Sequence, residues 1–233
     1  MIFQFKQFSI RQRDSAMKIG TDGLLLATTT PLSKSSLKVL DVGSGTGLIS
    51  LVIAQRAPEA KITAIEIEEN AARESELNFT QSPFAERLKV LNSSFQDFNS
   101  SETFDLIICN PPFYDGSQAE GSRKQARNSV MLPLDELAKG VSKLLIADGQ
   151  FSLIIPSQSE QSFIETATRF DLYPSEILRI RGRKDSKIIR SIIHFKKEKR
   201  EVQVNEMHIE VDKRHEYSED YINLTKDFLT IFD

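Results

Sequence analysis

Four adjacent residues, Asn110-Pro111-Pro112-Phe113, combine groups that could hold an amine for reaction. Each proline fixes its own φ and biases the residue before it toward extended backbone, so the turn is stiff. The Asn110 side-chain oxygen and the Pro111 carbonyl could accept both hydrogens of an exocyclic amino group, while Phe113 offers a flat face for stacking. This pattern favours attack by an amino nitrogen on an electrophile. The alternative is an ordinary turn closing the apolar strand predicted from Phe104, Leu106, Ile107, Ile108 and Cys109.

A glycine loop also has residue types that suit ligand binding. Gly43-Ser44-Gly45-Thr46-Gly47 stands between a predicted strand, Leu37 to Asp41, and a helical pattern of apolar residues. Glycines let the backbone approach a ligand, and the exposed N–H groups of a helix start attract an anion. A dinucleotide fingerprint has its third glycine three positions after the second, whereas Gly45 and Gly47 are only two apart. The loop therefore departs from the dinucleotide fingerprint.

Two acids follow predicted strands beside this loop. Asp41 ends the first strand and could hold an ammonium group, directly or through water. Glu66 follows the strand Ile62 to Ile65 and lies 21 residues after Gly45. An acid in this place can accept from both ribose hydroxyls of an adenosine, although an exposed glutamate is more often simply solvated.

The tetrad and the glycine loop together resemble the amino-methylating branch of the S-adenosylmethionine-dependent methyltransferases, whose hallmark is Asn-Pro-Pro followed by Tyr or Phe. A third segment, Lys18-Ile19-Gly20-Thr21-Asp22-Gly23, is similar to one that borders the methyl donor in a bacterial family acting on N6 of adenine 37 in a valine tRNA. The resemblance implies an α/β, Rossmann-like class I methyltransferase fold, with a seven-stranded, mostly parallel sheet whose last strand is antiparallel. It also implies S-adenosyl-L-methionine as methyl donor, tRNA as substrate and a direct displacement without a metal.

The resemblance assigns roles to individual residues. Where the family commonly has an Asp or Asn to bind the donor adenine, this chain has Ser94, so Asp97 is an alternative. The Phe95 backbone N–H and ring are expected to contact the same adenine. The expected catalytic set is Asn110, Pro111, Pro112 and Phe113. The expected donor contacts are Lys18, Gly20, Thr21, Asp22, Asp41, Gly43, Ser44, Gly45, Gly47, Glu66, Ser94, Phe95 and Asn110.

The distribution of charged residues along the chain indicates what kind of partner the protein binds. The formal net charge of −3 argues against a protein that coats nucleic acid nonspecifically. Residues 179–200 hold ten Arg or Lys against two acids, a local net of +8, whereas residues 201–233 hold nine acids against three bases, a net of −6. Basic side chains on a strand are often only solvated. We nevertheless expect RNA contacts from Arg123, Arg127, Arg181, Arg183 and Lys187, with a substrate lid between Tyr114 and Leu132.

The 233 residues suit one methyltransferase domain, 1–233, made of a segment bordering the donor site (1–36), a core (37–200) and a C-terminal extension (201–233). No apolar run is long enough to span a membrane and no signal core is evident, so we expect a cytoplasmic protein. We also expect a monomer. The lone Cys109 can form no internal disulfide and is expected in the core. No Cys or His cluster suggests a metal site.

Periodicity predicts the other elements. We expect a short strand or extended arm between Phe3 and Ile10. We expect helices over residues 70–79, 134–145, 163–170 and 221–231, and strands over 88–91 and 151–155. A hairpin is expected from residues 177–180 and 188–195, and one added strand over 201–211.

The sequence also allows other functions. Guanine-N2 methyltransferases acting on ribosomal RNA and glutamine-N5 methyltransferases acting on release factors share the tetrad, but both usually have a larger N-terminal part than this chain. A nicotinamide-dependent reductase would tolerate the glycine loop and Glu66, but no convincing catalytic Tyr-Lys or His is present. A noncatalytic RNA-binding module would lack donor binding.

Overall fold

The computed structural model describes residues 1–13, 18–112 and 132–232. Its helices are α1 (Thr21–Thr29), α2 (Leu48–Arg56), α3 (Glu69–Thr80), α5 (Leu134–Leu144), α6 (Glu160–Thr168) and α7 (Glu219–Thr225). Its strands are β1 (Ile2–Gln4), β2 (Ser9–Arg11), β3 (Lys38–Val42), β4 (Lys61–Glu66), β5 (Leu88–Asn92), β6 (Phe104–Cys109), β7 (Leu145–Pro156), β8 (Tyr173–Arg183), β9 (Ile188–Lys196) and β10 (Gln203–Glu210).

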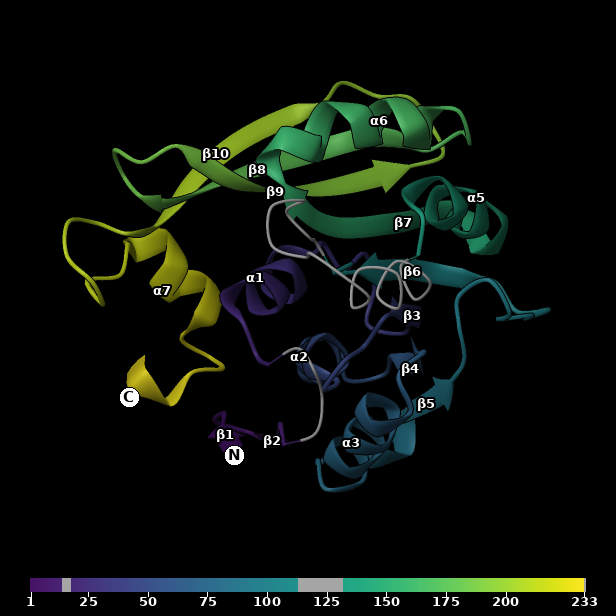
Figure 1. Cartoon of the computed structure of the whole chain (residues 1–233), viewed down its shortest axis with the longest axis horizontal. Coiled ribbons are helices and arrows are strands. Elements are labelled where there is room, and N and C mark those ends of the chain that lie inside the picture. The colour runs from purple at the N-terminus through teal and green to yellow at the C-terminus, as the bar shows by residue number, and fades with distance from the viewer. Residues whose placement is uncertain (14–17, 113–131, 233) are drawn as a thin grey trace, which may run out of the picture.

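Eight strands form one sheet in the order β10-β8-β9-β7-β6-β3-β4-β5. Strand β9 is antiparallel to both of its neighbours, and the other neighbouring strands are parallel. The α/β fold with a mostly parallel sheet and an antiparallel final core strand is thus confirmed. Strand β10, expected as an added strand, lies beside β8 as the eighth strand (Figure 1).

The sheet separates two apolar layers because adjacent strand residues point to opposite faces. Val39 packs into a layer with residues of α1, α2 and α7, whereas the next residue, Leu40, packs into a layer with residues of α5 and α6. Ile108 and Cys109 at the end of β6 divide in the same way. Strands covered on both faces read as continuous apolar runs, which explains the run before Asn110.

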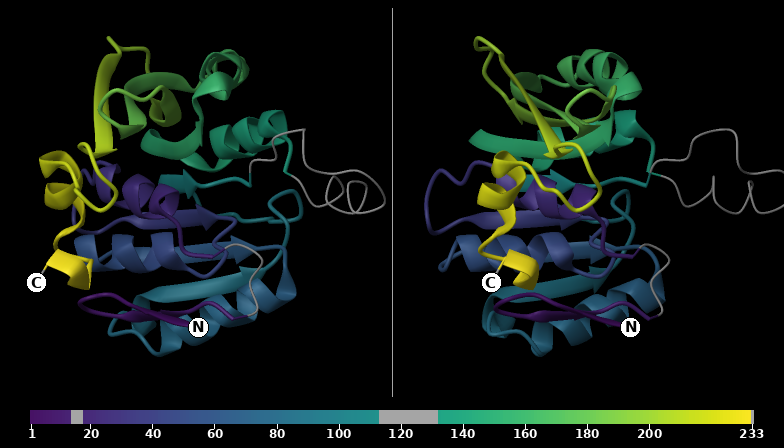
Figure 2. Two further views of the ribbon diagram at one scale, coloured as in Figure 1. Left: turned by 60° about the vertical axis from the view of Figure 1, so that its left-hand side comes forward. Right: turned by 90° about the vertical axis from the view of Figure 1, so that its left-hand side faces the viewer.

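The N-terminal strands and the C-terminal segment meet on one side of the molecule. Strands β1 and β2 form an antiparallel hairpin, where a strand or arm was expected. Phe5, just after β1, forms an isolated bridge with Leu229, and the Lys6 N–H donates to the Phe228 carbonyl at 2.8 Å. Figure 2 shows this hairpin next to the end of the chain.

The prediction of one closing helix over 221–231 was partly wrong. Ser218 caps α7 by accepting from the Tyr221 N–H, and the helix ends at Thr225. A short 3₁₀ turn, Thr230–Phe232, follows. The chain leaves the helix because its next residues hydrogen-bond to the N-terminal hairpin, and that tertiary pairing is absent from local periodicity.

Candidate active site

The predicted ligand residues meet at the carboxyl edge of the sheet. Strand β3 lies between β4 and β6, with Val42 opposite Ile65 on one side and Cys109 on the other. Gly43, Glu66 and Asn110 therefore leave neighbouring strands at the same edge. In open α/β sheets this edge is where ligands bind.

The glycine loop follows β3 in a conformation that favours glycine. Gly43, Gly45 and Gly47 have φ of 74°, 55° and 84°. A Cβ placed on Gly43 or Gly45 would meet nothing within 4 Å, so the backbone there borders open space. A Cβ on Gly47 would lie 2.5 Å from Phe79 Cε1, which indicates that this third glycine permits close packing of α2 and α3. The predicted contact between Gly47 and a ligand stays a prediction.

Asp41 carries the least satisfied polar group of this edge. Its side chain is fully buried, and Ser50 Oγ donates to Oδ2 at 2.6 Å. Among the described residues, Oδ1 has no hydrogen-bond partner. Burial raises the Asp41 pKa to about 7, against the hydrogen bonds from Ser50, and the negative charge of Glu66 adds to the rise. A buried carboxylate oxygen without a partner suits the ammonium group of a ligand, because the positive charge would stabilise the ionised carboxylate and offset its desolvation.

Glu66 is held rigidly beside the loop. It is 8% exposed; the Gly45 N–H donates to Oε2 at 2.8 Å, and the Glu68 N–H donates to Oε1 at 2.9 Å. A carboxylate has about four acceptor positions, so two bonds leave capacity for ribose hydroxyls. Ser44 is nearly buried, with its hydroxyl 3.4 Å from that of Ser75.

The turn after β6 lies against the start of α1. Asn110 is half-buried, Pro111 is buried and Pro112 is exposed. The Asn110 Nδ2 atom is 3.7 Å from the position that a Cβ on Gly23 would take. The last glycine of the Lys18–Gly23 segment thus lies beside the candidate catalytic amide. Phe113, the proposed stacking residue, lies outside the described residues.

The first residues of α1 are fixed by distant parts of the chain. Gly20, with extended backbone, precedes the helix. Arg190 Nε donates to Asp22 Oδ2 at 2.8 Å, and the side chain of Tyr221 interacts with that of Thr21. The structure therefore engages Asp22 in an ion pair with Arg190, which the sequence did not indicate.

The Lys18 side chain binds two backbone carbonyls that follow strand β2. Its Nζ donates to the carbonyls of Gln12 and Arg13 at 2.9 and 3.1 Å. The Ile19 N–H in turn donates to Gln12 Oε1 at 2.8 Å. These bonds tie the segment before α1 to the end of strand β2.

The expected adenine-binding residues follow β5. Ser94 Oγ donates to Asp97 Oδ2 at 2.6 Å and accepts from the Asp97 N–H at 3.0 Å, so the two proposed alternatives are bonded to each other. Phe95 is only 9% exposed, and its ring lies against Gly140 of α5, where a Cβ would come within 2.4 Å of Cε1. Because the ring packs in the core, its backbone N–H is the better candidate for a donor contact.

The basic residues expected to contact RNA lie in two different parts of the chain. Arg123 and Arg127 lie outside the described residues. Arg181 pairs with Glu206 at 2.9 Å and Arg183 with Glu210 at 3.6 Å, while Lys187 is exposed in the β8–β9 turn. The basic strand β8 and the acidic strand β10 are hydrogen-bonded neighbours, so the opposite charges of the two sequence regions face each other.

Cys109 is buried in the core, and burial raises the pKa of its thiol well above the ordinary value. Within residues 1–13, 18–112 and 132–232, no group of three or more His, Cys, Asp or Glu side chains could hold a metal ion. The helices described there are all too short or too polar to cross a membrane.

Comparison with known proteins places the chain among methyltransferases. Residues 8–160 match the family model described as "Methyltransferase small domain". A protein named tRNA1(Val) (adenine(37)-N6)-methyltransferase from Flavobacterium psychrophilum is 40% identical over 231 residues, covering 97% of this chain and 98% of the relative. A protein of the same name from Christiangramia forsetii is 43% identical over 232 residues, covering 97% and 96%.

Solved structures agree on the fold. A predicted O-methyltransferase from Agrobacterium tumefaciens superposes with a TM-score of 0.69 at 20% identity, covering 89% of this chain and 96% of that one. A precorrin-6y C5,15-methyltransferase from Geobacter metallireducens gives a TM-score of 0.55 at 14% identity, covering 80% and 93%. At such identities the likeness shows the Rossmann-like class I methyltransferase fold alone.

Proposed function

Because the chain belongs to the methyltransferase small domain family, alongside relatives named tRNA1(Val) (adenine(37)-N6)-methyltransferase, we propose that it methylates N6 of adenine 37 in a valine tRNA. S-adenosyl-L-methionine is its methyl donor. Family membership also decides against a nicotinamide-dependent reductase. We further propose that the chain acts in the cytoplasm as a monomer, with residues 1–233 forming one domain.

The carboxyl edge of the sheet suits the donor. The buried Asp41 Oδ1 would hold its ammonium group, and the open backbone at Gly43 and Gly45 leaves room for its carboxylate beside the start of α2. Glu66 would accept from the ribose hydroxyls. When bound, S-adenosyl-L-methionine supplies a methyl group already activated by the positive sulfur.

The residues of the Asn110 turn would hold the amine. The Asn110 side-chain oxygen and the Pro111 carbonyl accept its two hydrogens, which directs the nitrogen lone pair away from the turn. Since the prolines fix this backbone before substrate arrives, the alignment requires little reorganisation during reaction. The amine loses its proton after the methyl group has been transferred.

A paired adenine cannot reach two acceptors inside a turn. The base must be unpaired or flipped, at an unstacking cost of about a few kcal/mol. An adenine in the anticodon loop of a tRNA is unpaired and avoids much of this cost. Stacking on Phe113 would offset part of what remains.

One observation carries the proposal: the rigid Asn110-Pro111 turn stands at the same sheet edge as the glycine loop and the unsatisfied Asp41 carboxylate. The test is methylation of purified tRNA, ribosomal RNA and release-factor protein, followed by mass spectrometry of the digested products. We expect N6-methyladenosine in tRNA, lost with Asn110→Ala. Methylguanine or methylglutamine, without methylated tRNA adenine, would refute the substrate and leave the methyltransferase fold intact.

A further inference from the structure

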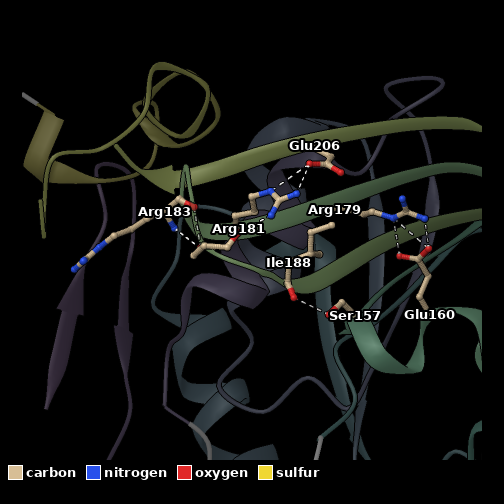
Figure 3. Close-up of polar contacts among 8 residues, drawn as sticks. Ser157, Glu160, Arg179, Arg181, Arg183, Ile188 and Glu206 are labelled. Carbon is tan, nitrogen blue, oxygen red and sulfur yellow. Dashed lines mark hydrogen bonds and ion pairs between the residues drawn. The ribbon is translucent and has the colours of Figure 1, made fainter. Parts of the chain in front are cut away.

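Three arginines of β8 form a row that Figure 3 shows beside β10 and the start of α6. Arg179, Arg181 and Arg183 alternate along the strand, so they project from the same face at intervals of about 7 Å. Each has a glutamate partner: Glu160, Glu206 and Glu210, respectively. We call these three pairs the arginine row.

The innermost pair is built into the fold. Arg179 donates from both Nε and Nη2 to Glu160, with Nη2 at 2.7 Å from Oε1, and Ser191 Oγ donates to Oε2 at 2.5 Å. The Glu160 side chain is only 13% exposed. Burial alone would raise the Glu160 pKa, but the hydrogen bonds from Arg179 and Ser191 outweigh it and lower the pKa. This pair anchors α6 to the sheet, so Arg179 is poorly placed to exchange partners.

The next pair is open to exchange. Arg181 donates from Nε and Nη2 to Glu206 Oε2 at 3.2 and 2.9 Å, and from Nη1 to the Ser186 carbonyl. The Glu206 side chain is 47% exposed, and ion pairs at such exposure change an equilibrium by at most about fivefold. A phosphate oxygen can replace the carboxylate without moving the guanidinium, which Ser186 holds in place.

The outermost pair is looser. Arg183 Nε is 3.6 Å from Glu210 Oε2, and the Arg183 side chain is 56% exposed. Figure 3 shows Arg183 extending away from Arg181, towards the end of the strand. Because β8 is parallel to β10 and antiparallel to β9, its carboxyl end shares the sheet edge of β6 and β7. Arg183, the arginine nearest the edge that carries Asn110, is also the most exposed of the three, at 56% against 35% for Arg179 and 30% for Arg181.

We propose that Arg181 and Arg183 bind phosphates of the RNA substrate in exchange for Glu206 and Glu210, and that these two glutamates limit binding of other polyanions. This inference rests on the proposed RNA substrate. The acidic extension 201–233 supplies both glutamates, so it serves as an internal competitor for the arginines. A tRNA that is also held at the active site displaces the glutamates. An RNA without that second contact gains less binding free energy and displaces them less readily.

The test compares Glu206→Gln with a matched control, Glu201→Gln. Glu201 is exposed, lies before the start of β10, and takes part in no ion pair among the described residues. Both variants remove one negative charge. Binding of total tRNA and of a ribosomal RNA fragment would be measured by fluorescence anisotropy, without donor, across a range of salt concentrations.

We expect Glu206→Gln to tighten binding of both RNAs by about two- to fivefold at 0.15 M salt, while Glu201→Gln changes it much less. Arg181→Gln should weaken binding and reduce the salt slope by about one phosphate contact. Thermal unfolding would confirm that each variant is folded. Equal affinities of the two glutamate variants, or an unchanged salt slope for Arg181→Gln, would overturn the inference.

The outcomes separate this inference from the proposed function. If the wild-type protein methylates tRNA adenine but the two glutamate variants bind RNA alike, the proposed function stands and the exchange of glutamate for phosphate is wrong. If methylation occurs only on ribosomal RNA while Glu206→Gln still tightens RNA binding, the arginine row stands and the tRNA assignment is wrong.

Discussion

Asp41→Asn should stabilise the free protein above neutral pH and weaken its binding of the methyl donor. Burial raises the Asp41 pKa from 3.8 to about 7, against the hydrogen bonds from Ser50. The unfolded chain therefore releases this proton at a lower pH than the folded chain does. Stability falls as pH rises from about 3.8 through about 7, and the full loss is present above that range. At about 1.4 kcal/mol per pKa unit, this loss of folding stability amounts to about 4 kcal/mol.

The substituted amide is never ionised and escapes this loss, yet it can still accept from Ser50. We expect the free energy of unfolding of Asp41→Asn, relative to wild type, to increase by about 2–3 kcal/mol between pH 5 and pH 8. Urea unfolding of the donor-free protein at both pH values measures this difference. Glu201→Gln, which removes an exposed carboxylate, should show almost none of it.

Donor affinity should change in the opposite direction. If Asp41 holds the ammonium of S-adenosyl-L-methionine, its replacement removes a charged hydrogen bond and should weaken binding about tenfold or more by calorimetry. A pH-independent stability difference would show that Asp41 ionises normally in the folded protein. Unchanged donor affinity in folded Asp41→Asn would show that this carboxylate does not contact the ammonium.

Three other substitutions test the site and its support. Asn110→Ala should leave donor affinity nearly unchanged and reduce turnover by about 10²-fold or more, since one preorganised contact to the reacting amine is lost; a collapse of donor binding with normal turnover per bound donor would make Asn110 structural. Gly45→Val should abolish donor binding in calorimetry, because its side chain would enter open space beside the loop at a φ of 55°; unaltered affinity in a folded variant would contradict the pocket. Gly140→Ala, normally favourable in a helix, should instead destabilise the protein by about 1–3 kcal/mol in urea, because its Cβ would meet the Phe95 ring at 2.4 Å; equal or higher stability would show that the ring yields easily.

Local sequence patterns, such as apolar runs and a glycine loop, were enough to predict part of the fold. Buried parallel strands such as Leu106–Cys109 read as apolar runs, and a glycine loop between a strand and a helix places Asp41 and Gly45 at one edge of the sheet. The Asn110 turn was identified because two prolines restrict its backbone regardless of tertiary context.

Other features depend on partners far apart in sequence. The ion pair between Asp22 and Arg190 was not predicted, because nothing local links the two residues. The expected contact of Asp22 with the donor stays a prediction. The basic run around Arg181 suggested an open RNA surface, yet the acidic extension lies directly beside it. Phe95 was expected to cover an adenine, but the absence of a side chain at Gly140 lets the ring enter the core.

The bridge between Phe5 and Leu229 sets the order in which the protein can mature during synthesis. Translation makes the hairpin and the α1 segment before Leu229 and before the Tyr221 that supports Thr21. The sheet up to β7 can collapse earlier, because chains of this size commonly form collapsed intermediates before folding is complete. The start of α1, which lies beside Asn110, gains the support of Tyr221 only after that later segment has been made. In a nascent chain, the core of the sheet should therefore assemble before the start of α1, beside Asn110, is fully supported.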